Sequence, residues 1–155
     1  MDMWFPLMDE TKKTFDKLHG YYFEDLELGM WGLFSKTISE AHILAYAGVS
    51  GDTNPLHLDK NFGSHTIFKS CVAHGMLAAG LISTVIGTKL PGPESIYLSQ
   101  SLRFKAPVFI GDTIVATVKI TKLILLKKIA ELKTTCSVRE KAVLCGEAKV
   151  LVPSK

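Results

Sequence analysis

Cysteine is scarce in this 155-residue sequence, which contains only Cys71, Cys136 and Cys145. The number is odd and the spacings match no metal-binding motif, so neither a disulfide scaffold nor a zinc site is predicted. Reduced thiols are therefore expected, as in a cytoplasmic protein. One pairing stays open, because Cys136 and Cys145 would be cross-strand neighbours if their segments formed a tight hairpin.

An excess of charge of one sign is also missing. The formal net charge is +3, and no basic run is interleaved with aromatic residues, which argues against nucleic acid as a partner. Three of the histidines, His19, His42 and His65, show no ligand spacing with each other or with the cysteines. No metal is therefore assigned.

The sequence has no long hydrophobic run and no targeting segment. Its longest apolar stretch, Gly75 to Leu90, contains interruptions such as Ser83 and Lys89 and falls short of the about 20 residues that a membrane span needs. It is better explained as a buried core helix. The first ten residues, MDMWFPLMDE, lack the basic start of a signal peptide. These features predict no membrane association and a cytoplasmic location.

No linker or internal repeat divides the chain. Hydrophobic residues make up 47% and charged residues 21%, which is typical of one globular domain. We expect residues 1–20 to be an N-terminal extension and residues 21–155 to form the domain.

The first half of the domain shows strand and helix signals. Residues 31–38 are predicted to form a strand, and turn-forming residues make 50–57 a loop, followed by an irregular polar segment over 59–70. Residues 75–89 are predicted to form an apolar helix. Between strand and loop, Ser39 is expected to cap a helix that ends at Val49. The residues expected on one side of that helix are Ile43, Leu44, Ala47 and Gly48.

After Pro91-Gly92-Pro93 the apolar period changes to two. Successive strands joined by short turns form an antiparallel meander. Because the apolar helix needs cover on all sides, the sheet is expected to curve around it. The predicted class is α+β, with a curved antiparallel sheet wrapped around a central apolar helix. The four strands are expected at 96–105, 114–121, 132–139 and 142–152, with turns at Gly111-Asp112 and Glu140-Lys141.

The segment YAGVSGDTNPLH, residues 46–57, contains the residues best suited to chemistry. It places Asp52, Asn54 and His57 within six positions of a loop that Pro55 stiffens. An acid and an imidazole with separate roles can add water to a double bond, because one takes a proton from water while the other gives a proton to carbon. The alternative is an ordinary polar turn, since Asp and Asn readily form Asx-turns.

A second signal is Ala73-His74-Gly75-Met76, which opens the apolar helix. The first N–H groups of a helix have no internal partner, so the Gly75 N–H can stabilise a carbonyl oxygen on which charge develops. The alternative is a tight helix entry. Ser83 lies eight residues further on and either lines the pocket or bonds back to its own helix.

Taken together, these segments resemble the MaoC-like, (R)-specific enoyl-CoA hydratase family. The matching pieces are YAGVSGDTNPLHLD (46–59), VAHGML (72–77), LPGPESIYLSQSLRFKAPVFIGD (90–112) and the final strands, over roughly residues 24–152. The resemblance implies a single hot-dog domain, usually a homodimer, that hydrates trans-2-enoyl-CoA as a hydro-lyase. It implies no cofactor, because coenzyme A is part of the substrate.

The resemblance also assigns roles to residues. The family's catalytic Asp and His fall on Asp52 and His57, which we expect to act as base and acid. The loop Asn, the carbonyl-binding Gly and an assisting Ser fall on Asn54, Gly75 and Ser83.

Further residues are expected to contact the substrate: His74, Met76 and Ile86. Arg103 and Lys105, expected on one strand face, either meet the coenzyme A phosphates or form a solvated face.

Three other functions are compatible with parts of this pattern. A 3-hydroxyacyl-ACP dehydratase uses the same chemistry in reverse on a protein-bound thioester. A hot-dog thioesterase commonly relies on one acidic residue, and the Asp52–His57 combination argues against it. A non-catalytic acyl-binding module would have a damaged pair, and both residues are intact.

Overall fold

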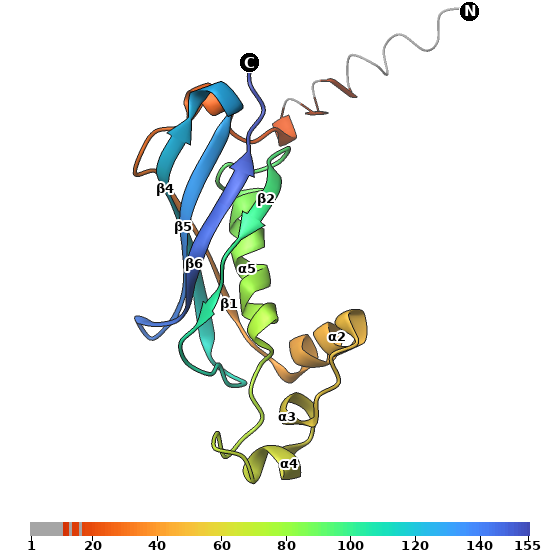
Figure 1. The fold of residues 1–155 in the computed structure, drawn as a ribbon. Helices are drawn as coiled ribbons and strands as arrows, with labels where there is room; N and C mark the ends of the chain where they lie inside the picture. The colour runs from red at the N-terminus through yellow and green to blue at the C-terminus, as the bar shows by residue number, and fades with distance from the viewer. Residues whose placement is uncertain (1–10, 13, 16) are drawn as a thin grey trace, which may run out of the picture.

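The computed structural model describes residues 11–155 except 13 and 16, so most of the predicted N-terminal extension lies outside the described residues (Figure 1). In the part that is described, no helix has the length and apolar character required to cross a membrane. The helical elements are η1 (Phe23–Asp25), α2 (Glu40–Ser50), α3 (Pro55–Leu58), α4 (Lys60–Ser64), α5 (Gly75–Thr88) and η2 (Leu125–Lys127). The strands are β1 (Trp31–Thr37), β2 (Ile96–Gln100), β3 (Arg103–Phe104), β4 (Thr113–Ile124), β5 (Ile129–Val138) and β6 (Lys141–Leu151).

The strands form one antiparallel sheet in the order β1-β4-β5-β6-β2, with β3 also paired to β6. The predicted meander is confirmed for β4, β5 and β6. It is wrong for the segment 96–105, which divides into β2 and β3 and pairs with β6 rather than with β4. Between β2 and β3, Ser101 approaches Gly146 so closely that a Cβ on Gly146 would lie 1.8 Å from the Ser101 carbonyl oxygen.

The core lies between the sheet and α5, which runs along one face of the sheet (Figure 1). The predicted alternation in β4 is confirmed, since Ile114, Val118 and Ile120 are at most 1% exposed. Each fully buried side chain of this size contributes about 1.5–3 kcal/mol. The sheet was expected to cover α5 on all sides, but one side of the helix is exposed. This exposed side of α5 carries Met76 and the small residues Gly80, Ser83 and Gly87.

The helix α2 begins as predicted, with Ser39 as its N-cap. The Ser39 Oγ accepts the His42 N–H at 3.4 Å, and the Ser39 N–H donates to His42 Nδ1 at 3.1 Å, so an imidazole completes a capping box. Ile43 and Ala47, one turn apart, are the buried residues of α2. Leu44 is 56% exposed and Gly48 is also exposed, so only part of the predicted apolar side is buried.

The segments predicted as irregular contain two short helices. Pro55 begins α3, where its missing N–H costs no hydrogen bond, and the Asp59 carboxylate caps α4. The chain therefore remains ordered from α2 to the start of α5. The helices α2, α3 and α4 all lie near that start (Figure 1).

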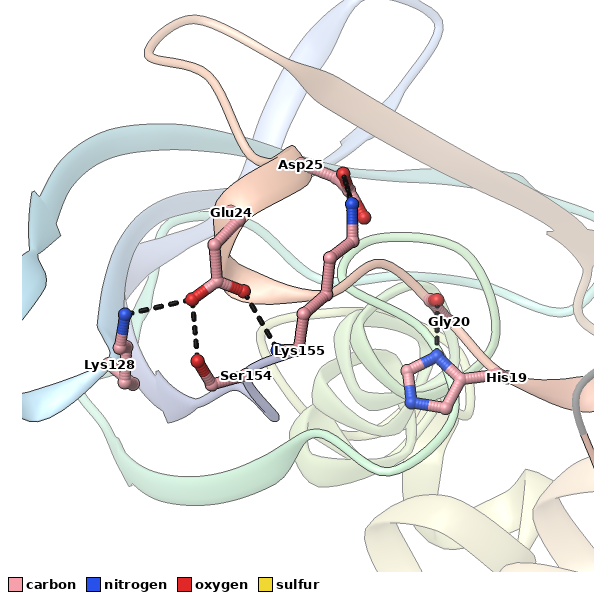
Figure 2. A network of polar contacts seen from close by, with 7 residues as sticks. All are labelled: His19, Gly20, Glu24, Asp25, Lys128, Ser154 and Lys155. Atoms are coloured by element: carbon pink, nitrogen blue, oxygen red, sulfur yellow. Dashed lines mark hydrogen bonds and ion pairs between the residues drawn. The ribbon is translucent and has the colours of Figure 1, made fainter.

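Hydrogen bonds close the far end of the molecule (Figure 2). The Glu24 carboxylate accepts bonds from Lys128 Nζ at 2.8 Å, Ser154 Oγ at 2.5 Å and the Lys155 N–H at 3.0 Å. Lys155 Nζ also donates to Asp25 at 2.5 Å. The bond from Lys128 is the largest cause that holds the pKa of Glu24 well below its ordinary value. These contacts join η1 to the last residues of the chain.

The cysteines are free thiols. Cys136 lies opposite Leu144, whereas Cys145 lies opposite Thr135. Adjacent pairs in a ladder point to opposite faces of the sheet, so Cys136 and Cys145 face away from each other and the pairing left open above is wrong. Burial raises the pKa of the Cys136 thiol to about 12.

Candidate active site

A cavity of about 520 Å³ lies where the start of α5 meets the loop after α2, α3 and the segment that follows β3. Most of its lining is apolar, including Leu56, Phe68, Val72 and Phe104. Six residues predicted from sequence also border it: Asp52, His57, His74, Gly75, Met76 and Lys105. An apolar cavity with a few convergent polar groups is the usual form of a small-molecule site.

The loop that carries Asp52 is shaped by its own hydrogen bonds. Helix α2 ends at Gly51, whose φ of +78° lies in the left-handed region that glycine adopts at no steric cost. The Asp52 N–H donates to Ser50 Oγ at 3.2 Å, and the Asn54 N–H donates to Asp52 Oδ1 at 3.3 Å. This is the turn anticipated as the alternative, and it places the exposed Asp52 carboxylate at the cavity.

Asn54 serves the loop rather than the cavity surface. Its Oδ1 accepts the Leu56 N–H at 3.0 Å, so the side chain caps α3. Asn54 lies between Asp52 and His57 in the chain, and its hydrogen bonds hold the backbone that connects these two residues.

His57 is oriented by a backbone carbonyl. Its Nδ1 lies 2.7 Å from the Val72 oxygen, which can only accept, so Nδ1 carries a hydrogen. Nε2 is then the ring atom left for proton transfer. This contact cannot be read from the sequence, because any residue type at position 72 supplies the same carbonyl.

Asp52, His57 and His74 each place one oxygen or nitrogen atom within 4.8 Å of the others. No direct hydrogen bond joins the Asp52 carboxylate to the His57 ring in the described part of the chain. The 4.8 Å limit is short enough for a single water to bond to both the carboxylate and the imidazole, because two hydrogen bonds of about 2.8 Å span about 4.5 Å.

The two histidine rings of this cluster lie close together. Their centroids are 3.8 Å apart and their planes are tilted by 31°. Each ring uses one nitrogen on a backbone carbonyl, which leaves the other nitrogen of each ring without a backbone partner among the residues that the structure describes.

Gly75 is the first residue of α5, and its N–H has no acceptor among the described residues. A Cβ at this position would lie 2.6 Å from the Phe104 ring, so only glycine permits this packing. Gly75 thus both forms a tight helix entry and presents its N–H at the cavity, so the two interpretations of the His74-Gly75-Met76 segment apply together.

Besides Asn54, three predicted residues lie outside the cavity. Ile86 is 1% exposed and belongs to the core, and Ser83 is on the exposed side of α5, about 12 Å along the helix from Gly75. Arg103 borders a separate depression with Lys133 and Cys145. Lys105 follows the end of β3 and borders the main cavity, so the two basic residues line different depressions.

Comparisons with known proteins agree with this geometry. A family model described as MaoC like domain matches residues 33–142, which include the loop, α3 and the start of α5. An (R)-specific enoyl-CoA hydratase of Rhodospirillum rubrum is 52% identical over 140 residues, covering 90% of this chain and 97% of that protein. A 3-hydroxybutyryl-CoA dehydratase of Methylorubrum extorquens is 47% identical over 139 residues, with coverage of 90% and 88%. The solved (R)-hydratase from A. caviae, involved in PHA biosynthesis, has a TM-score of 0.82 and 44% identity, covering 84% of this chain and 99% of that one.

Proposed function

This chain belongs to the MaoC-like family, and we propose that it is an (R)-specific enoyl-CoA hydratase with the hot-dog fold. This hydro-lyase adds water to trans-2-enoyl-CoA and gives (R)-3-hydroxyacyl-CoA. One observation carries the proposal: a carboxylate and an imidazole, with polar atoms within 4.8 Å of each other, lie beside a helix-start N–H in an apolar cavity.

The substrate's thioester carbonyl accepts a hydrogen bond from the Gly75 N–H. This bond strengthens as the carbonyl becomes enolate-like, so it stabilises the transition state more than the ground state. Loss of one oxyanion-hole donor costs about 3–4 kcal/mol in a known case. The start of α5 thus supplies the electrostatic part of catalysis.

Asp52 and His57 move the protons. The Asp52 carboxylate takes one proton from the bound water, whose oxygen forms a bond to C3 of the substrate. The π electrons of the double bond shift toward the carbonyl, and C2 takes a proton from Nε2 of His57, which carries both ring protons at that step. The proton on Asp52 then returns to His57, which completes the cycle. No metal or nucleotide cofactor takes part.

The rest of the site binds the thioester. Met76 and the apolar lining contact the acyl part, and the exposed Lys105 at the cavity meets a phosphate of coenzyme A. A 3-hydroxyacyl-ACP dehydratase uses the same residues in reverse, and its carrier would approach the same lysine. The names of the two relatives, both of which refer to coenzyme A, favour the free thioester.

A homodimer in the cytoplasm completes the proposal. The sheet ends in β1 and β2, and β2 exposes Ile96 by 56% and Leu98 by 49%. An uncovered apolar edge strand is a natural pairing surface for a second copy. The free thiols fit a reducing compartment.

Substitution of the proton-transfer pair tests the mechanism. Asp52→Asn and His57→Ala should each lower kcat for crotonyl-CoA hydration by about 10²- to 10⁴-fold, the usual contribution of positioned acid–base groups. Their melting temperatures should stay near that of the native protein. His65→Ala is the matched control, because His65 is exposed at the end of α4 and lies outside the cavity. Near-native kcat in either site variant would refute the assignment.

A further inference from the structure

We propose that His74 is a positioning residue that fixes the Asp52 loop, the His57 ring and the Gly75 N–H relative to one another. The proposal rests on the function given above and adds a role for a residue that had been expected to contact substrate. His74 is the residue immediately before α5, so it precedes the carbonyl-binding Gly75 in the chain.

His74 makes a directed contact with the catalytic loop. Its Nε2 lies 2.9 Å from the Asp52 backbone oxygen, and since a carbonyl can only accept, Nε2 carries the hydrogen. The bond joins residues that are 22 positions apart in the chain. It fixes the backbone from which the Asp52 carboxylate projects.

The ring of His74 also contacts two other rings. Its centroid lies 3.8 Å from that of His57, with the planes tilted by 31°, and 4.8 Å from that of Tyr46, with the planes at 52°. His57 is thus held by Val72 along its edge and by His74 across its face. Four elements meet at this single side chain: the end of α2, the loop, α3 and the start of α5.

Burial separates this role from substrate binding. His74 is 2% exposed, one of two buried polar or charged residues in the described part of the chain. Its Nδ1 is buried and has no hydrogen-bond partner. A buried polar atom without a partner carries a desolvation cost, so an apolar side chain of this size would be preferred here for packing alone. The bond from Nε2 to the Asp52 carbonyl explains why a histidine is present.

Three substitutions divide the role into parts. His74→Phe keeps the ring and removes the donor, His74→Gln places an amide donor near the position of Nε2, and His74→Asn places it near that of Nδ1. The assay is steady-state hydration of crotonyl-CoA by the full chain, with thermal unfolding in parallel. His65→Gln is the matched control, as an exposed histidine outside the cavity.

We expect His74→Phe to lower kcat by about 10²-fold with KM within about threefold of native, because a displacement of about 1 Å in the reacting groups costs this much. His74→Gln should recover at least about tenfold of that loss, and His74→Asn should not. A merely structural role would lower the melting temperature and leave kcat of the folded fraction unchanged. That result overturns the inference, as does equal activity of the Gln and Asn variants.

The outcomes also separate this inference from the proposed function. If the native protein does not hydrate crotonyl-CoA, the proposed function fails. If the native protein is active and Asp52→Asn is not, while the His74 variants match the native kcat, only the positioning role fails. If His74→Phe does not fold, the comparison of Gln with Asn still decides, because the two carry the same amide group and differ by the one methylene that moves its donor.

Discussion

Substitution of Gly75 by alanine isolates the packing that the site needs at the start of α5. The added Cβ would lie 2.6 Å from one Phe104 ring carbon and 2.9 Å from the next, whereas ordinary contacts begin at 3.4 Å. The ring must therefore withdraw by about 0.8 Å, the difference between the shortest of these distances and an ordinary contact. Phe104 borders the same cavity, so its movement changes the surface against which the substrate lies.

The expected result is a catalytic defect without unfolding. Phe104 is 53% exposed, so its ring can move without breaking the core, and the melting temperature should change little. A displacement approaching 1 Å next to the reacting carbonyl should lower kcat by up to about 10²-fold. Steady-state hydration of crotonyl-CoA and a thermal melt on the same preparation measure both quantities.

Two further variants test the reasoning. Gly80→Ala is the matched control on the same helix, since a Cβ there meets nothing within 4 Å; it should raise stability by about 1 kcal/mol and leave kcat unchanged. Phe104→Ala removes the ring that the new methyl group meets, so the double variant should be more active than Gly75→Ala alone. A double variant no better than the single one would refute the steric explanation.

Three other expectations concern different parts of the molecule. Glu24→Gln should weaken the acid dependence of unfolding. The folded pKa of Glu24 lies below the ordinary 4.5, so the ionised carboxylate stabilises the folded protein above that pH, and this stabilisation is lost as the pH falls. The melting temperature of the native protein should therefore drop more steeply below about pH 5 than that of the variant. Iodoacetamide should modify the half-buried Cys145 before the fully buried Cys136, whose thiol pKa is raised to about 12; mass spectrometry showing the reverse order would contradict the register of β5 and β6. Lys105→Ala should raise KM for crotonyl-CoA several-fold at low salt, whereas Arg103→Ala should not, because Arg103 borders a different depression; equal effects would place both at the substrate.

Local patterns in the sequence predicted much of the fold. The alternation in β4 and the apolar run of α5 describe how each segment meets the core, and both are confirmed. The pairing of the segment 96–105 was not predictable in this way. It depends on contacts 46 positions apart, such as the bond from the Glu147 N–H to Ser101 Oγ, and the alternation along one strand carries no information about its neighbour.

The site, like the fold, was predictable only in part. Asp52, His57 and Gly75 were predicted because their residue types and sequence context indicate a catalytic role, and the structure brings all three to one cavity. The Val72 carbonyl and the Phe104 ring were missed, because the first is backbone and the second resembles any apolar strand residue. His74 was identified as a site residue but with a substrate-binding role, since burial is a property of the tertiary structure.

The central claim is hydration of an enoyl thioester, and the most direct test is to mix the native protein with crotonyl-CoA. Ultraviolet absorbance of the conjugated enoyl thioester and release of free thiol are followed in the same reaction. The account predicts that the enoyl absorbance falls while no thiol appears, and that the product is (R)-3-hydroxybutyryl-CoA. Thiol release at the rate of absorbance loss, or an (S) product, would contradict it.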